Sequence, residues 1–369
     1  MKVLHLLSST GFHGAESMTA ELVRQLHALG VDIHVAAFDA GDGGNTDILQ
    51  AVNGHAQGVA RIPCNGPLDR HAFQQLNAYL REHRIDLVHS HKYKTTFYAM
   101  PGRWLRRFKL VTTYHNWLTH TPALKFYAAL DKQLARFNDA AVAVSTPVAE
   151  ELRRHMPSRR VHQIDNGIDI QRYARQMSRQ EAKAQLGLDP NRPVLGFVGR
   201  LSPEKGLGFL IQALQQRSHE LGGVQTLIVG AGEEQHALEA QIKQAGLQDR
   251  VQLLGNRRDT PLIYSALDAF VLPSLIEAFP MVLLEAMSCG CPVIATDVGE
   301  VHRIVQPGVT GLIVPPQDAA ALGQALVNLL TAPDRADRMG QTASQEAQKR
   351  FSATSMARQY LQVYQDCLG

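Results

Sequence analysis

Short apolar segments rich in β-branched residues alternate with longer helical patterns along all 369 residues. The short segments are apolar on both faces, which is typical of parallel strands that helices cover on each side. Such alternation predicts doubly wound α/β layers, and a single sheet would need about twelve strands, more than open sheets usually contain. We therefore expect two sheets. The predicted strands are Lys2–Leu7, Asp32–Phe38, Leu87–His89, Leu110–Tyr114, Ala140–Val144, Val161–Ile164, Val194–Val198, Thr226–Val229, Val251–Leu253, Ala269–Leu272, Pro292–Ala295 and Leu312–Val314.

A polar stretch at Gln171–Pro193 divides the chain into two parts. It contains Gly187 and two prolines and precedes a new strand, as linkers do. We expect a first domain over residues 1–175, a second over 176–350 and a terminal helix over 351–369. In doubly wound sheets ligands bind at the carboxyl ends of the strands. Two facing sheets would therefore form one cleft, with the chemistry in the loops that follow strands.

Charge is distributed unevenly over these parts. The net charge of +3 combines 21 Lys+Arg and 15 Asp+Glu in residues 1–178 with 16 and 19 in residues 179–369. The first part also holds 13 of the 16 histidines. A uniformly basic nucleic-acid binder would not show this division, and the pI of 8.6 is below the value of ~9 that usually marks one. We expect no nucleic-acid partner.

Nothing in the sequence points to export or membrane insertion. The apolar run at the start is too short for a signal peptide, and no run approaches the ~18 apolar residues that span a bilayer. Four cysteines form no disulfide framework, and no second Cys or His pair stands at zinc spacing from Cys289 and Cys291. We expect a cytoplasmic protein.

Two loops between a strand and a helix have the composition of anion-binding loops. Ser8–Glu16 contains Gly14 just before a predicted helix, where backbone amides can approach a ligand, although an ordinary tight turn explains it equally well. Gly199–Gly206 adds Arg200 and Lys205 between two glycines. A planar guanidinium and a mobile ammonium suit a diphosphate. The alternative for the second loop is a solvated surface turn.

Two glutamates, Glu277 and Glu285, stand on either side of Pro280, which suits the first turn of a helix. A fully helical path would separate them by ~12 Å, more than the ~5–9.5 Å between the two carboxylates of a glycosidase. We therefore interpret them as hydroxyl acceptors at different points of one ligand. The alternative is that Glu285 serves the helix electrostatically and Glu277 is solvated.

Histidines follow two predicted strands in the basic part. We expect His89 and His91 to alternate across their strand without sharing a face, with no third ligand at metal spacing. No two aspartates are separated by a single residue, so an Asp-x-Asp metal–diphosphate site is not available. We expect no metal. His115 lies just past a strand's carboxyl end and is the better candidate for a functional role.

The segment Phe97–Lys109 combines basic and aromatic side chains. This composition suits an anionic membrane surface. A helix face with snorkelling cations is an equal alternative. The side chains concerned are Arg103, Trp104, Arg106, Arg107 and Lys109.

Several segments, in the right order, resemble those of GT-B-fold glycosyltransferases of the retaining family 4 type. This resemblance covers nearly the whole chain and is most specific in the second half. It implies two Rossmann-like α/β domains facing across a cleft, with a C-terminal helix, about Ala353–Cys367, that crosses back to the first domain. The matching segments are His13–Glu16, Val144–Ser145, Ile164–Asp169, Gly199–Leu201, Lys205–Gly206, Glu277–Glu285, Gly290–Gly299 and Gly311–Val314.

The resemblance also implies that a nucleotide-diphosphate sugar, UDP-, GDP- or ADP-linked, binds mainly to the second domain and the acceptor to the first, with no cofactor. Arg200 and Lys205 would neutralise the diphosphate in place of a metal. Glu277 would accept from a donor-sugar hydroxyl and Glu285 from ribose hydroxyls. Further implied contacts are the backbone around Phe279, Pro280, Met281 and Val282, the Gly14 loop at the diphosphate and His115 beside the donor sugar.

One departure concerns the first glutamate. The family commonly has Glu-Gly-Phe-Gly where this chain has Glu277-Ala278-Phe279-Pro280. Proline lacks a backbone N–H, so one implied contact to the donor sugar is affected.

The resemblance leads to a functional expectation. We expect a retaining, metal-independent hexosyltransferase that acts on a glycan or lipid-linked acceptor in cell-surface polysaccharide or lipopolysaccharide assembly. We expect it to be peripheral on the inner face of the cytoplasmic membrane. One alternative is a sugar-nucleotide epimerase or isomerase on the same architecture. Another is a membrane-peripheral binding protein with a degenerate site.

Overall fold

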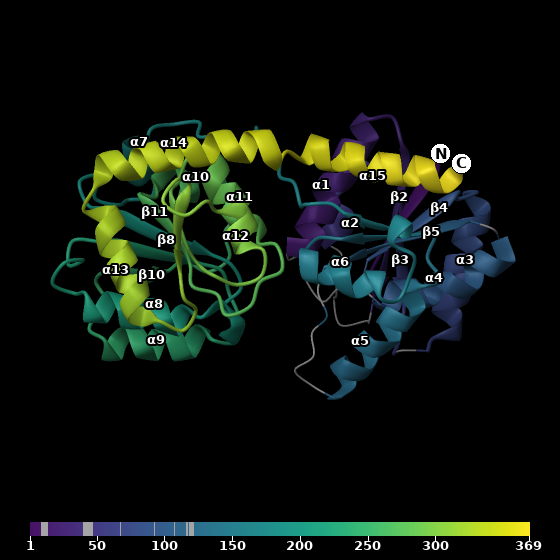
Figure 1. Cartoon of the computed structure of the whole chain (residues 1–369), viewed down its shortest axis with the longest axis horizontal. Coiled ribbons are helices and arrows are strands. Elements are labelled where there is room, and N and C mark those ends of the chain that lie inside the picture. Colours follow the sequence, from purple (N-terminus) through teal and green to yellow (C-terminus); the bar gives the residue numbers. More distant parts are fainter. Residues whose placement is uncertain are drawn as a thin grey trace. The chain divides into compact units, whose positions relative to one another are not determined.

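The computed structural model describes residues 1–8, 14–39, 47–66, 68–91, 93–106, 108–115, 117 and 122–369, and only the backbone of 104–106 and 122–124. The chain forms two compact units (Figure 1). The first comprises Met1–Gly167 together with Ala353–Gly369, and the second comprises Ile168–Ser352. No helix within the described ranges is both long and apolar enough to cross a membrane.

Parallel strands of the described residues form a seven-stranded sheet in the first unit, in the order β3-β2-β1-β4-β5-β6-β7. The chain runs outward from β1 to β3 and then returns to β4, so the strand order reverses between β1 and β4. The strands are β1 (Lys2–Ser8), β2 (Asp32–Asp39), β3 (Gly58–Pro63), β4 (Leu87–His91), β5 (Lys109–Tyr114), β6 (Ala140–Ala143) and β7 (Val161–Gln163). The helices are α1 (Gly14–Ala28), α2 (Asp47–Ala51), α3 (Arg70–Glu82), α4 (Tyr93–Arg106), α5 (Pro122–Ala135), α6 (Thr146–Arg153) and α15 (Ala353–Leu368).

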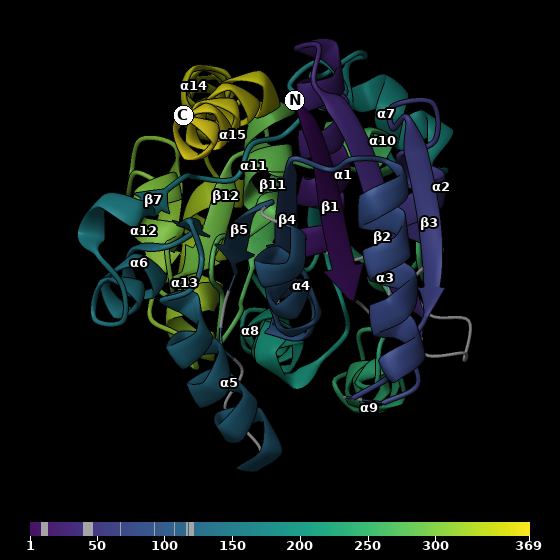
Figure 2. The ribbon, with the colours of Figure 1, turned by 90° about the vertical axis from the view of Figure 1, so that its right-hand side faces the viewer.

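Both faces of this sheet are covered, which explains why its central strands are apolar throughout. Leu4 and Leu6 of β1 pack on one face against residues of α3 and α4 (Figure 2). On the other face lie α1 and α15, which contact each other. Two tyrosines of α15 bond to the sheet: the Tyr364 hydroxyl lies 2.6 Å from His89 Nδ1 and the Tyr360 hydroxyl 3.1 Å from Thr113 Oγ1.

The second unit repeats the scheme with a six-stranded parallel sheet in the order β10-β9-β8-β11-β12-β13. Here the strand order reverses between β8 and β11. The strands are β8 (Val194–Val198), β9 (Gln225–Val229), β10 (Val251–Leu253), β11 (Ala269–Leu272), β12 (Val293–Thr296) and β13 (Gly311–Val314). The helices are α7 (Arg179–Gln185), α8 (Leu207–Gln216), α9 (Gln235–Gln244), α10 (Thr260–Ala266), α11 (Met281–Ser288), α12 (Val301–Ile304), α13 (Ala319–Leu330) and α14 (Pro333–Arg350).

The predicted fold class, an α/β architecture with two doubly wound parallel sheets, is confirmed. The expected terminal helix is α15, and it belongs to the first unit. The sequence analysis missed β3, because this edge strand alternates between half-buried and exposed residues and is not apolar on both faces. The binding roles assigned to the two parts of the chain stay predictions.

A close approach between α14 and the turn after α11 generates a stability prediction. Gly340 lies inside α14, and a Cβ there would stand 2.2 Å from the backbone oxygen of Gly290. Gly340→Ala should therefore destabilise the fold by about 1–3 kcal/mol through overpacking, although alanine is the better helix former. Gly208→Ala in α8 is the matched control, since its nearest neighbour is the flexible Gln241 side chain at 3.3 Å.

Denaturant melts of both variants measure the effect. The control should leave the free energy of unfolding unchanged or raise it by up to about 1 kcal/mol. Equal, small effects of the two substitutions would show that α14 and the turn at Gly290 are not in contact.

Candidate functional site

The loops that follow β8 and β11 lie side by side because these strands are neighbours in the sheet of the second unit. The strand order reverses at this point, which is where doubly wound sheets bind ligands. The first loop carries the Gly199–Gly206 motif and the second carries Glu277. The fold therefore brings the Gly199–Gly206 motif and Glu277 to one topological position.

Backbone packing fixes one loop against the other. Gly206 has a left-handed φ of +63°, and a Cβ there would stand 2.2 Å from the Pro273 backbone oxygen. The Leu275 N–H donates to the Glu204 carbonyl oxygen at 2.7 Å. Because glycine alone fits this approach without strain, Gly206 is what brings the preceding lysine to the β11 loop.

Lys205 and Glu277 form an ion pair across these loops. The Lys205 Nζ lies 2.6 Å from Glu277 Oε1, and the Ser274 hydroxyl donates to the same carboxylate oxygen at 2.7 Å. The glutamate side chain is 9% exposed. A nearly buried carboxylate needs such partners to offset its lost hydration. Both side chains are therefore held in place.

The loop after β12 supports Glu277 from the other side. Gly299 has a φ of +55°, and a Cβ there would stand 2.0 Å from the Glu277 backbone oxygen. The Glu300 N–H donates to the Ala278 carbonyl oxygen at 3.1 Å. Three loops at the carboxyl end of the sheet thus position one carboxylate.

Arg200, the second cation of the motif, is more accessible. Its side chain is half-exposed and forms an ion pair with Glu204 of the same loop. Each of the two cations therefore has a carboxylate partner from within its own unit, and an incoming anion would compete with Glu204 and Glu277 for them.

Glu285 lies in α11 and belongs to a different set of contacts. Its carboxylate is buried and accepts from the Tyr264 hydroxyl at 2.8 Å. Burial raises the pKa of the Glu285 carboxyl, and hydrogen bonds from Tyr264 and Tyr173 oppose that shift. The structure thus brings Arg200, Lys205 and Glu277 to neighbouring loops, while Glu285 is packed among tyrosines.

The helix that contains Glu285 begins one residue after Pro280, at Met281. The N–H groups of the first helical turn have no partner inside the helix, and Met281 and Val282 supply two of them. Phe279, just before, is buried with its ring edge-on to Phe351. The segment thus presents backbone donors where the sequence analysis expected sugar and phosphate contacts.

In the first unit, Gly14 is the first residue of α1, while His13 and Asn116 lie outside the described residues. His115 follows β5 directly, and its ring stacks on that of His91 with 6.1 Å between centroids. The expectation that His89 and His91 point to opposite faces is wrong. Their ring centroids are 4.3 Å apart, because residues two apart in a strand share a face.

The basic segment of the first unit is described in part. Arg103 donates to the Phe137 carbonyl oxygen and, at 2.8 Å, to Asp139, while the Lys109 Nζ lies 3.9 Å from the same carboxylate. The side chains of Trp104 and Arg106, and all of Arg107, lie outside the described residues. The two described cations are therefore engaged within the unit, and a membrane contact stays a prediction.

Sequence reasoning missed Asp131, a buried acid in α5. Its Oδ2 accepts from the Trp117 indole N–H at 2.9 Å, and its buried Oδ1 has no hydrogen-bond partner. Burial raises the pKa of Asp131 from 3.8 to about 7. Such a shift is common at functional sites. No local motif marks this residue, and only its contact with the tryptophan after β5 reveals it.

Comparison with known proteins gives the family. Residues 178–346 match the family model described as Glycosyl transferases group 1, and residues 12–172 match that of Glycosyltransferase Family 4. The architecture is thus the GT-B α/β fold, and the chain belongs to the group 1 and family 4 glycosyltransferases.

Individual relatives cover the chain to different extents. It is 32% identical to a D-inositol 3-phosphate glycosyltransferase of Nocardia farcinica over 83% of this chain and 71% of the relative. It is 31% identical to the lipopolysaccharide core biosynthesis mannosyltransferase LpsB of Rhizobium meliloti over 71% of this chain and 73% of the relative. It is 32% identical to an alpha-D-kanosaminyltransferase of Streptomyces kanamyceticus over 62% of this chain, and it spans 60% of that relative's length.

Two solved structures of one protein resemble this chain over nearly its full length. Anabaena HepE in complex with UDP-glucose is 26% identical, with a TM-score of 0.86, over 99% of this chain and 100% of that chain. Its complex with UDP is 25% identical with a TM-score of 0.86.

The buried acid of the first unit generates a pH-dependent prediction. Because the folded-state pKa of about 7 exceeds the ordinary value of 3.8, the native state holds an extra proton and loses stability as pH rises from about 4 through about 7. Asp131→Asn removes the titration and keeps an oxygen for Trp117. It should stabilise the protein at pH 8 by up to about 4 kcal/mol, and little at pH 4.

Thermal melts of both proteins from pH 4 to 8 measure this difference. A stability difference that does not change over the range would contradict the raised pKa.

Proposed function

We propose that this chain transfers a hexose from a nucleotide-diphosphate sugar to a glycan or lipid-linked acceptor, with retention of configuration and without a metal ion. The observation that carries the proposal is the Lys205–Glu277 pair, held by three loops where the strand order of the second unit reverses. A cation and a carboxylate at one such position suit a ligand with a diphosphate and hydroxyl groups.

Lys205 and Arg200 would bind the diphosphate. Each is paired with a carboxylate, Lys205 with Glu277 and Arg200 with Glu204. A diphosphate carries more charge than either carboxylate, so it would draw both cations. Preorganised cations stabilise the charge that develops on the leaving group. The amide groups of Met281 and Val282 at the start of α11 would add donors to the same anion.

Glu277 would then accept from a hydroxyl of the donor sugar. Its bond from Ser274 keeps the carboxylate in place when the lysine turns to the diphosphate. Glu285 would accept from ribose hydroxyls, and it would do so through a carboxylate already oriented by Tyr264. Gly14 and His115 of the first unit are proposed as diphosphate and donor-sugar contacts.

The chemical step is a front-face displacement. The bond between the anomeric carbon and the diphosphate oxygen breaks while the acceptor oxygen forms its bond on the same face. The acceptor proton passes to the leaving phosphate oxygen. The charge of the leaving group is thereby shared between that proton, Lys205 and Arg200.

The relatives support a class of donor and acceptor. HepE is solved with UDP and with UDP-glucose, which favours uridine among the UDP-, GDP- and ADP-linked donors. LpsB is a mannosyltransferase of lipopolysaccharide core biosynthesis, which favours a cell-surface glycan or lipid-linked acceptor. Such acceptors lie at the cytoplasmic membrane, and the basic segment Phe97–Lys109 is proposed as the peripheral contact.

Removing the lysine tests the diphosphate role. Lys205→Ala should lower the transfer rate by about 100-fold or more, as expected for loss of one transition-state donor. Lys243→Ala, on the exposed face of α9, is the matched control and should leave transfer unchanged. If the two variants transfer sugar equally well, the site is elsewhere. A new sugar nucleotide formed from donor alone would instead indicate an epimerase.

Glu277→Gln distinguishes the proposed diphosphate contacts from the proposed donor-sugar contact. Glutamine keeps an oxygen for Ser274 but no longer neutralises Lys205, so UDP should bind as tightly as before or more tightly, while sugar transfer falls. Thermal shift with UDP measures the first effect and product formation the second. Loss of UDP binding together with activity would contradict the assignment of Glu277 to the sugar.

A further inference from the structure

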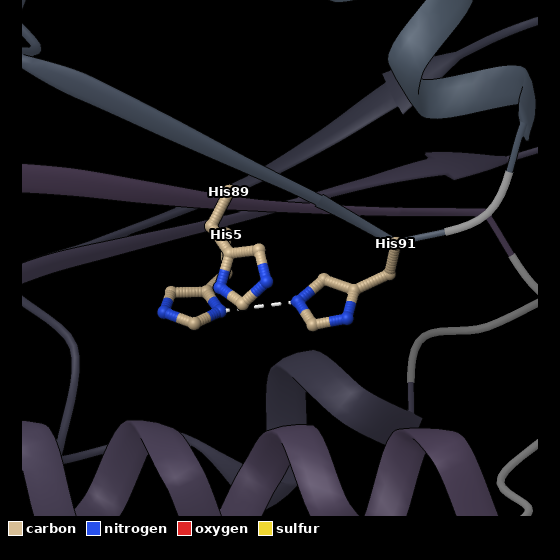
Figure 3. A group of neighbouring side chains, drawn as sticks. All are labelled: His5, His89 and His91. Carbon is tan, nitrogen blue, oxygen red and sulfur yellow. Dashed lines mark hydrogen bonds between the residues drawn. The ribbon is translucent and has the colours of Figure 1, made fainter. Parts of the chain in front are cut away.

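Three histidines meet inside the first unit, at the other reversal of strand order. His5 of β1 and His89 of β4 are register partners in the parallel sheet, and His91 is the last residue of β4. All three side chains are buried and lie on the sheet face toward α1 and α15 (Figure 3). They lie apart from the loops of the second unit that carry Arg200, Lys205 and Glu277, while the His91 ring stacks on that of His115.

The three rings present nitrogen atoms to one another. His5 Nδ1 lies 3.2 Å from His91 Nε2 (Figure 3), and one nitrogen from each of the three histidines falls within 4.8 Å of the others. Two imidazole nitrogens bound tetrahedrally to zinc at ~2.0–2.1 Å stand ~3.3 Å apart. The first pair already has about this separation, and a nitrogen of His89 lies within 4.8 Å of both.

The protonation state of these histidines favours metal binding. Burial lowers the pKa of His5 to about 3 and that of His89 well below 6.5. Both imidazoles are therefore neutral at physiological pH. Neutral imidazole is the form that coordinates metals, because coordination uses the ring nitrogen's lone pair.

Hydroxyl groups around the cluster orient the rings. The Tyr364 hydroxyl lies 2.6 Å from His89 Nδ1, the Thr113 hydroxyl 2.7 Å from His89 Nε2, and the Thr19 hydroxyl 3.4 Å from His91 Nδ1. Both nitrogens of His89 have a hydroxyl partner, so a bound ion would take the place of one hydroxyl and leave the other to orient the ring. His5 Nε2, by contrast, is buried and has no hydrogen-bond partner.

We propose that His5, His89 and His91 form a metal site for a late first-row divalent ion of the zinc type. The ligand set contains only imidazole nitrogens, which suit Zn²⁺, Co²⁺, Ni²⁺ or Cu²⁺ and not the oxygen-preferring Mg²⁺ or Ca²⁺. The ion links β1 to β4. Its role is structural, and sugar transfer does not pass through it.

Metal binding by the full chain, purified without a histidine tag and stripped by chelator, tests the proposal. Co²⁺ should bind at one ion per chain with a visible absorption spectrum distinct from that of the hydrated ion, and Zn²⁺ should displace it. Zn²⁺ should also raise the melting temperature of the metal-free protein, because the ion binds only the folded state. This second measurement needs no variant.

Variants locate the site. His5→Gln or His91→Gln should weaken Co²⁺ binding by at least about 100-fold, more than loss of a partner that only orients a ligand. His34→Gln is the matched control, since His34 is a buried histidine of neighbouring β2 bonded to Tyr79. It should leave the stoichiometry and affinity unchanged.

Two results would overturn the proposal. One is the absence of both a Zn²⁺-induced rise in melting temperature and the cobalt spectrum in the unaltered chain. The other is Co²⁺ binding of undiminished affinity in His5→Gln and His91→Gln, which would place the ion on other histidines. Neither result bears on sugar transfer.

Discussion

The reversal of strand order in each sheet is the constraint on which the functional geometry depends. In the second unit β8 and β11 are neighbours whose following loops leave the sheet toward opposite sides. Two loops distant in sequence therefore begin next to each other. Left-handed Gly206 and Gly299 allow the backbones to approach closely enough for Lys205 to reach Glu277. A larger residue at either glycine would push the backbones apart and separate Lys205 from Glu277, although no charge would change.

The local charge of the loop after β8 differs from the net charge of the surrounding chain. Residues 179–369 carry 16 basic and 19 acidic residues, yet two of the basic ones stand in one loop at the sheet's carboxyl end. Each of the two forms an ion pair with a carboxylate, Glu204 or Glu277. In the proposed function a diphosphate would exchange with these carboxylates, so the ion pairs would stabilise the buried carboxylate and still leave cations for the ligand. Net charge would then be a poor guide to the ligand of this unit.

Sequence patterns predicted what local periodicity and composition determine. The strands buried on both faces, the α11 start beside Pro280 and the cation-rich loop at Gly199–Gly206 were all predicted. Edge strand β3 was missed because only part of it is buried. Asp131 and the histidine cluster depend on contacts between distant segments. No local pattern contains such contacts, and the opposite-face assignment of His89 and His91 had hidden the cluster.

We infer that the loops after β8 and β11 hold the diphosphate of a nucleotide sugar, and a crystal structure of the chain with bound UDP tests this inference. Diphosphate oxygens should lie within hydrogen-bond distance of Lys205 Nζ and of the Met281 or Val282 amide, and the distance between Lys205 Nζ and Glu277 Oε1 should exceed 2.6 Å. UDP bound at any other position, with that ion pair unchanged, would contradict it.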